Sequence, residues 1–207
     1  YSPESLAHEI DKQILNNFDA VVLACGSEEP RDLNIPGRQL KGIHFAMDFL
    51  TLQNKICEGD NIKLENEFNA KNKNVVVIGG GDTGSDCIGT SNRQGASTVT
   101  QLEILDKPPV QENKMLTWPN WPLKLRTSSS HEEGANRNWS VSTKFFKGDG
   151  NKVKSLTLKK IEWEKNSEGK MQMKDCSGED SEITIKADLV LLAMGFIHPV
   201  KDRLIKD

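Results

Sequence analysis

The sequence predicts an α/β fold in which a parallel sheet with helices is combined with an antiparallel β-meander. The run N-V-V-V-I at 74–78 has no polar interruption, which is typical of a strand buried on both faces, in a parallel sheet with helices on each side. A helix is expected over 83–94, ended by Gly95 in a left-handed conformation, and a second strand over 97–104. From residue 141 onward, short alternating runs separated by polar turns predict antiparallel strands.

The residues before this core predict four simpler elements. Residues 2–18 begin with Ser, Pro and an early acid, which is a typical helix start. Residues 19–26 are interpreted as a buried strand that ends in a tight glycine turn. A short helix is expected over 43–52, and the polar segment 54–73 is interpreted as a linker.

The later residues contain an irregular segment and a strand with a phase slip. The segment 106–122 holds four prolines and is expected to be irregular. Apolar residues then alternate along 153–163, but the phase slips between Leu158 and Ile161, which predicts a β-bulge near 159–160. The last predicted strand runs over 187–193.

The composition describes a chain that can bury a core and carries no extreme charge. Its 207 residues (23.1 kDa) suit one large domain, or one domain with pieces of a second. The formal net charge is −3 and no dense Lys/Arg run occurs, which argues against nucleic acid as a partner. The longest apolar run, 189–197, is too short to cross a bilayer, and no signal peptide is recognised. The 4 cysteines lie far apart without C-x-x-C spacing, so we expect no metal site and a reducing, cytoplasmic location.

The motif G-G-G-D-T-G at 79–84 carries the chemistry of the chain. It contains G-x-G-x-x-G directly after a β-branched strand and at the start of a helix, which is the context of a dinucleotide-binding turn. The first glycine permits the tight turn, the second lets backbone N–H groups approach a pyrophosphate, and the third lets the helix pack close to the sheet. The positive end of that helix then holds the phosphate charge. The predicted cofactor-binding residues of this turn are Gly79, Gly80, Gly81, Asp82, Thr83 and Gly84.

The acid expected after such a turn is Glu103, 22 residues beyond Gly81. A carboxylate there accepts hydrogen bonds from both ribose hydroxyls of NAD and repels the 2′-phosphate of NADP. Lys107 is the nearest base and could still reach a phosphate. Glu103 therefore modestly favours NADH and leaves NADPH open, and its simpler interpretation is a solvated residue at a strand end.

Two segments resemble each other, D-A-V-V-L-A-C-G at 19–26 and D-L-V-L-L-A-M-G at 188–195. Each has an acid, an apolar strand and Ala-x-Gly. A small-residue turn at the carboxyl edge of a parallel sheet lets a flat ligand lie against the backbone. Two such turns predict two nucleotide domains, one inserted into the other, whereas the simpler interpretation is two ordinary core strands.

The segment G-G-G-D-T-G-S-D-C-I-G-T at 79–90 resembles the small (beta) subunit of glutamate synthase, as do 101–109, 118–122, 126–134 and 187–196. This resemblance implies a two-dinucleotide-domain fold like that of glutathione reductase, in which a hydride passes from NADH or NADPH to FAD. Electrons then pass through iron–sulfur clusters to FMN in the large (alpha) subunit, where 2-oxoglutarate and glutamine-derived ammonia become glutamate. Because the cofactors carry the chemistry, no catalytic side chain is expected.

The resemblance implies two further groups of cofactor-binding residues. Those near the nicotinamide are Ala193, Met194 and Gly195. Those on the flavin side are Ala24, Cys25 and Gly26. The family's cysteine-rich motifs and its FAD fingerprint are not recognised here, so the chain is expected to be a fragment that needs the remainder of the FAD domain. We expect residues 1–70 to be a partial FAD-domain segment and linker, 71–200 the NAD(P)-binding domain, and 201–207 the return to the FAD domain. This piece alone is expected to be inactive and to hold no stoichiometric FAD.

Three other features have weaker interpretations. Residues 128–133 (S-S-S-H-E-E) are interpreted as a helix start capped by a serine rather than as a catalytic cluster. Trp118 and Trp121 are expected to cover the sheet edge or to form a contact surface. Cys25 and Cys87 are expected to be buried, inert thiols.

Alternatives to glutamate synthase stay open from the sequence. One is a related ferredoxin-linked oxidoreductase subunit, or the reductase part of a dihydropyrimidine dehydrogenase. Another is a non-catalytic module that senses NADH, which the fold alone permits. The Trp-Pro and S-S-S-H-E-E segments favour glutamate synthase.

Overall fold

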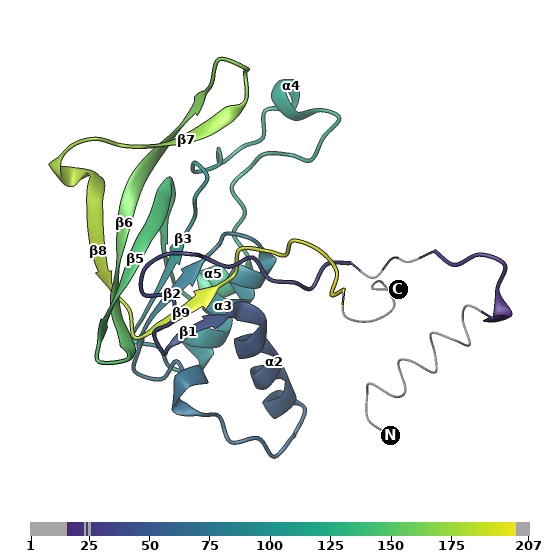
Figure 1. The fold of residues 1–207 in the computed structure, drawn as a ribbon, viewed down its shortest axis with the longest axis vertical. Coiled ribbons are helices and arrows are strands. Elements are labelled where there is room, and N and C mark those ends of the chain that lie inside the picture. Colours follow the sequence, from purple (N-terminus) through teal and green to yellow (C-terminus); the bar gives the residue numbers. More distant parts are fainter. Residues whose placement is uncertain (1–15, 23, 25, 202–207) are drawn as a thin grey trace. The chain divides into compact units, whose positions relative to one another are not determined.

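A computed structural model describes residues 16–22, 24 and 26–201 of the chain (Figure 1). The chain divides into two compact units, Asp32–Met194 and a smaller one made of Tyr1–Arg31 with Gly195–Asp207. The domain boundaries predicted above stay a prediction.

The larger unit is built on a five-stranded parallel sheet in the order β1-β9-β2-β3-β4. Its strands are β1 (Ile43–Phe45), β2 (Asn74–Ile78), β3 (Thr98–Leu102), β4 (Asn136–Asn138) and β9 (Leu189–Leu192). The strands predicted over 74–78, 97–104 and 187–193 are confirmed to within two residues at every end. β9 lies between β1 and β2, so a strand from the end of the unit stands beside one from its beginning.

Helices connect the first strands of this sheet. Helix α2 (Ala46–Cys57) follows β1, and α3 (Asp82–Arg93) follows β2 and ends before Gly95, which has φ 84°. The expectation of a single helix over 43–52 was wrong at its start, because 43–45 pair with β9 and are therefore extended. The expected linker over 54–73 contains the end of α2 and a short 3-10 helix, η1 (Asn66–Phe68). Two short helices come later, α4 (Lys114–Thr117) within the proline-rich segment and α5 (Ser129–Glu132).

An antiparallel sheet follows β4. Its strands are β5 (Val141–Asp149), β6 (Lys152–Lys165), β7 (Met171–Asp175) and β8 (Glu182–Lys186), with the 3-10 helix η2 (Glu179–Ser181) between the last two. β6 pairs with all three others. The bulge predicted near 159–160 was misplaced. The register shifts lie at Thr143/Phe145 and Lys147/Gly148, and the phase slip instead marks where β6 exchanges β8 for β7 as its partner.

The parallel sheet is buried on both faces by different layers (Figure 1). On one face, Val75, Val77 and Leu191 pack with residues of α2 and α3. On the other face, Val76 and Val190 pack with residues of β5 and β6. The expectation of helices on each side was therefore wrong for one face. The β-branched run of β2 indicates that the strand is buried on both faces, but it does not identify the layer that buries it. An antiparallel sheet buries a strand as completely as helices do.

The smaller unit brings two distant segments together. Arg31 N–H donates to the Gly195 carbonyl (2.9 Å) and Ile197 N–H donates to the Glu29 carbonyl (2.9 Å), around an antiparallel bridge between Pro30 and Phe196. The strand predicted over 19–26 is not found in its described residues, because no described strand pairs with them and Val22 is 91% exposed. Cys25 and nearly all of the helix predicted over 2–18 lie outside the described residues.

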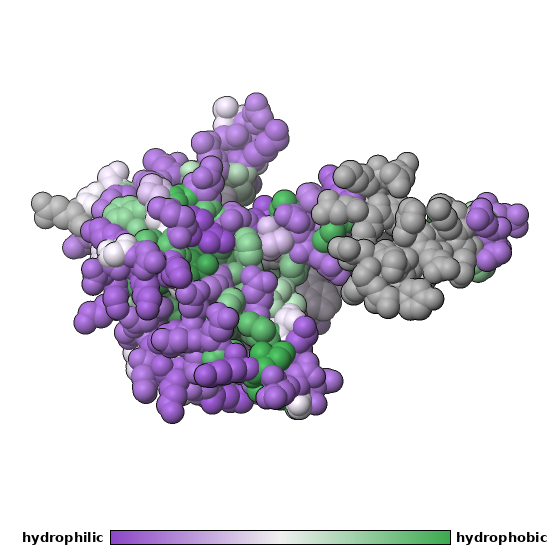
Figure 2. All heavy atoms as spheres, turned by 60° about the horizontal axis from the view of Figure 1, so that its bottom comes forward, coloured by the Kyte–Doolittle hydropathy of each residue, from purple (hydrophilic) through white to green (hydrophobic). Residues whose placement is uncertain are grey.

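Hydrophilic residues cover most of the face seen in Figure 2, and apolar residues gather there only in small areas. In the part of the chain that the structure describes, no helix is long and apolar enough to cross a membrane.

Candidate functional site

The glycine turn at 79–84 joins β2 to α3, and its glycines meet different surroundings. Gly79 has φ 127°, and a Cβ there would collide with the Ala193 carbonyl at the end of β9. A Cβ at Gly84 would lie 2.5 Å from the Gly79 carbonyl oxygen. A Cβ at Gly81 would meet nothing within 4 Å. The first and third glycines therefore serve the packing of the fold, whereas the second leaves its backbone open to a ligand.

Helix α3 begins at this open glycine. Gly81 is the N-cap residue, and no side chain caps the helix. The first N–H groups of a helix have no partner within it, and they form the positive end of the helix dipole. This end of α3 is therefore suited to hold a phosphate group.

A cavity of about 840 Å³ lies over this helix end. Its walls come from the glycine turn, the end of β3, the segment before α5, and β4. The lining residues are Gly80, Gly81, Asp82, Ser85, Glu103, Pro108, Trp121, Lys124, Leu125, Arg126, Thr127, Ser128, His131 and Arg137. Three of these are cationic (Lys124, Arg126, Arg137) and two are anionic (Asp82, Glu103), so the walls favour an anionic ligand.

Glu103 follows the end of β3 and lies against the turn, since a Cβ at Gly80 would collide with its carboxylate. Its Oε1 accepts a hydrogen bond from Arg137 Nη2 on β4 at 3.1 Å, and the two side chains are only 15% and 14% exposed. Arg137 also donates from Nη1 to the carbonyl of Arg126 (3.0 Å), and its guanidinium stands over the Trp139 ring at 4.9 Å. The predicted acid is therefore held in a nearly buried ion pair.

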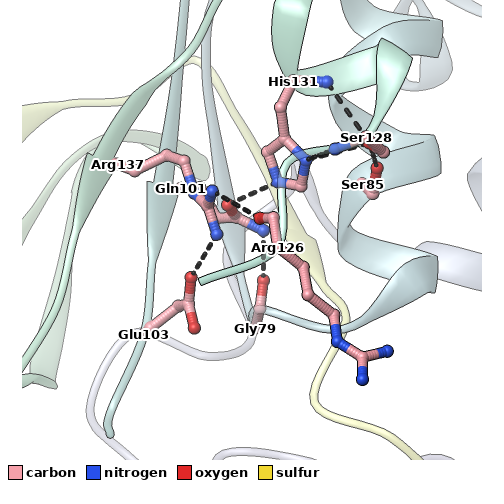
Figure 3. Close-up of polar contacts among 8 residues, drawn as sticks. All are labelled: Gly79, Ser85, Gln101, Glu103, Arg126, Ser128, His131 and Arg137. Atoms are coloured by element: carbon pink, nitrogen blue, oxygen red, sulfur yellow. Dashed lines mark hydrogen bonds and ion pairs between the residues drawn. The ribbon is translucent and has the colours of Figure 1, made fainter. Parts of the chain in front are cut away.

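The side chain of Arg126 points in a different direction from that of Arg137. Figure 3 shows its guanidinium extending away from the pair formed by Glu103 and Arg137. It stacks over the ring of Trp121 at 4.6 Å. Lys107, the base considered from the sequence, stands over Trp139 at 5.1 Å and does not line the cavity.

A chain of hydrogen bonds connects the glycine turn to α5 (Figure 3). Gln101 Nε2 donates to the Gly79 carbonyl (3.0 Å), which leaves Gln101 Oε1 to accept from His131 Nε2 (3.1 Å). His131 Nδ1 then accepts from the Ser128 backbone N–H (3.2 Å), while the Ser128 hydroxyl bonds that of Ser85 on α3. The bond that His131 Nδ1 accepts requires the neutral imidazole, because a protonated ring has no acceptor nitrogen. Burial, together with the charge of Arg137, lowers the pKa of His131 below its usual 6.5.

The capping prediction for residues 128–133 is confirmed. Ser128 is the N-cap of α5, and it forms a capping box in which His131 occupies the position usually held by Glu or Gln. Trp118 and Trp121 are 81% and 76% exposed, and Trp121 lines the cavity. Cys87 is buried in α3, as expected, and burial raises the pKa of its thiol to about 12.

The other predicted residues divide between the two units. Ala193 and Met194 follow β9 in the larger unit, where the Ala193 carbonyl meets the glycine turn. Ala24, Gly26 and Gly195 lie in the smaller unit. The roles of Gln101, His131 and Arg137 were not predicted, since single polar residues far apart in the sequence carry no pattern. The segment 126–134 resembles glutamate synthase small subunits, but this resemblance predicted no role for Arg126.

Comparison with known proteins decides the family. Residues 6–202 match the profile of the pyridine nucleotide-disulphide oxidoreductases. The chain belongs to this family. The predicted resemblance to glutamate synthase small chains is also confirmed. The small chain of glutamate synthase [NADPH] from Mycobacterium tuberculosis is 44% identical over 92% of this chain, and glutamate synthase [NADH] from Schizosaccharomyces pombe is 47% identical over 88%. The chain spans only 38% and 9% of the lengths of these two curated relatives.

Solved structures agree with the fold of this oxidoreductase family. FprA from Mycobacterium tuberculosis, in complex with NADPH, aligns over 89% of this chain and 51% of its own with a TM-score of 0.60 and 19% identity. The thioredoxin reductase of T. acidophilum aligns over 88% of this chain and 45% of its own with a TM-score of 0.51 and 20% identity. The predicted α/β class, with a parallel sheet and an antiparallel sheet, is confirmed.

Proposed function

We propose that the chain is the pyridine-nucleotide-binding part of a flavin-dependent oxidoreductase, and that NADH or NADPH is its ligand. The observation that carries this proposal is the open backbone of Gly81 at the N-terminus of α3, facing a cavity with an excess of cationic side chains. A dinucleotide has the two features that this site selects, an anionic pyrophosphate and a ribose with hydroxyl groups.

Each part of the cofactor would meet a different group of residues. The pyrophosphate would lie on the backbone of the turn at 79–84, including Gly80, Asp82, Thr83 and Gly84. The adenosine ribose would meet Glu103, whose carboxylate lies against that turn. The nicotinamide would lie toward Ala193, Met194 and Gly195. This cofactor supplies the hydride, and the residues of the chain orient it.

FAD would be held mainly by parts of the protein beyond this chain. The sequence carries one G-x-G-x-x-G motif, which the nicotinamide cofactor would occupy. Ala24, Cys25 and Gly26 would contribute the flavin contact from this side. We therefore expect the isolated chain to bind a pyridine nucleotide without retaining flavin.

At the level of the whole enzyme, we propose the electron-input role of a glutamate synthase small chain. Electrons from FAD would pass through iron–sulfur clusters to FMN in a large subunit, for glutamate synthesis from 2-oxoglutarate and glutamine, in the cytoplasm. This part rests on the 44% and 47% identity to proteins named glutamate synthase. In the complete enzyme, NAD(P)H oxidation that requires both 2-oxoglutarate and glutamine would support it, whereas oxidation that requires a pyrimidine would support the dihydropyrimidine dehydrogenase alternative.

Calorimetric titration of the chain with NADH and with NADPH, at equal ionic strength, tests the proposed site directly. We expect one nucleotide to bind per chain, with a Kd between about 1 μM and 1 mM, the range of most cofactor and substrate sites. Absence of binding for both nucleotides up to several times the upper limit of that range would refute the site.

A further inference from the structure

We propose that Arg137 determines nucleotide specificity, because its ion pair with Glu103 lets this site accept the 2′-phosphate of NADPH as well as the bare ribose of NADH. This inference rests on the proposed function and deepens it. An acid alone at the position of Glu103 indicates NAD, since a carboxylate repels the 2′-phosphate. The structure adds a guanidinium that the sequence pattern did not reveal.

The pair lies beside the glycine turn, so an adenosine ribose would meet it if the pyrophosphate lies on that turn. A Cβ at Gly80 would collide with the Glu103 carboxylate, so this carboxylate lies directly beside the glycine turn. Arg137 Nη2 donates to Oε1 at 3.1 Å, and no described residue donates to Oε2. One carboxylate oxygen is therefore neutralised by the guanidinium, while the other is available to accept from a ribose hydroxyl.

Arg137 is fixed in place rather than mobile on the surface. The Arg126 carbonyl accepts its second N–H bond at 3.0 Å, and the Trp139 ring lies under its guanidinium at 4.9 Å. Because the side chains of the pair are 14% and 15% exposed, water and salt screen them less than they screen a surface pair. A 2′-phosphate beside Glu103 would thus be within the field of a nearby positive charge that is already oriented.

The electrostatic consequence has a definite sign for each partner. Without Arg137, Glu103 would be an uncompensated anion and would disfavour NADPH more than NADH. Without Glu103, the cation of Arg137 would remain and would favour NADPH. At the effective dielectric constants found near a protein surface, a unit charge about 6 Å from a ligand phosphate changes the affinity for that ligand roughly tenfold or more.

The test compares the ratio of NADPH to NADH affinity in matched variants of the chain. Adenosine 2′,5′-bisphosphate and 5′-AMP are titrated as well, because they carry the discriminating phosphate without the nicotinamide. Relative to the unchanged chain, we expect Arg137→Gln to lower the ratio about tenfold and Glu103→Gln to raise it about tenfold. The double variant should return to within about threefold of the starting ratio, as should Arg137→Lys, which keeps the charge.

Arg126→Gln is the matched control, since it removes a cation from the same cavity without touching Glu103. This substitution should weaken the binding of both nucleotides and leave the ratio of their affinities within about threefold of that of the unchanged chain. Thermal melting of each variant shows whether Arg137→Gln still folds, and the Glu103→Gln result stands if it does not. An unchanged ratio in Glu103→Gln, or an equal shift in Arg126→Gln and Arg137→Gln, would overturn the role of Arg137 while nucleotide binding itself persists. If the unchanged chain bound neither NADH nor NADPH, this result would instead refute the proposed function.

Discussion

Substitution of Gly81 by Val separates ligand binding from folding. The backbone of Gly81 has φ −81° and ψ −173°, an extended conformation that Val adopts readily. Its Cβ would meet no protein atom within 4 Å. The remaining cost to folding is the replacement of glycine by a poor N-cap residue, about 1 kcal/mol. We therefore expect the Gly81→Val variant to fold, with only a small decrease in its free energy of unfolding.

Binding should respond far more strongly. The new side chain would occupy the space through which a pyrophosphate reaches the N–H groups at the start of α3. Loss of that approach should weaken NADH and NADPH at least about 100-fold, which corresponds to about 2.7 kcal/mol. Calorimetric titration measures the affinity, and urea unfolding of the same samples measures the stability.

Gly84→Ala provides the contrasting control in the same turn. Its Cβ would lie 2.5 Å from the Gly79 carbonyl oxygen and 3.2 Å from Gln101 Nε2, so the turn itself must move. We expect stability to fall by about 1–3 kcal/mol. If Gly81→Val bound either nucleotide with unchanged affinity while folded, the pyrophosphate could not lie on this turn, and the reasoning from the open glycine would be wrong.

Three further predictions concern stability and reactivity. Burial lowers the pKa of His131 and of His44, so the unfolded chain binds more protons at pH values between the folded and unfolded pKa. The stability contribution of the two neutral side chains is therefore complete above about pH 6.5 and is lost as the pH falls. When the free energy of unfolding is measured with urea from pH 8 to 5, it should change less with pH in His131→Asn than in the unchanged chain. Burial raises the pKa of Cys87 to about 12, so peptide mapping after iodoacetamide at pH 8 should find exposed Cys57 alkylated and Cys87 alkylated only in denaturant. Leu191→Ala, in a fully buried position of β9, should lower the free energy of unfolding by about 2–5 kcal/mol in the same urea assay, and a loss below about 1 kcal/mol would contradict its place in the core.

The sequence predicted the elements whose pattern is local. The unbroken apolar run of β2, the glycine turn and Gly95 each carry their own physical signature, and the structure agrees with the strand and helix predicted there. The start of helix α5 at Ser128 was predicted for the same reason, since a cap is a local arrangement.

Features that depend on distant partners were not predictable in this way. Strand β1 has three residues, too few for a periodicity, and it is extended only because β9 pairs with it. The layer that covers the second face of the parallel sheet is another example, because the burial of β2 does not reveal what buries it. At the site, Arg137 reaches Glu103 across 34 positions of sequence, and no spacing rule connects them.

The place of β9 in the sheet has a consequence for how the chain acquires its structure. β1 and β2 have no direct pairing, and the strand that joins them comes more than 110 residues after β2. Until that strand arrives, the hydrogen-bonding edges of both neighbours stay open, and open edges are where chains associate wrongly. Contacts of such large sequence separation also slow folding. We expect a nascent or truncated chain that ends before residue 189 to be prone to aggregation, while the antiparallel strands before it can already pair with one another.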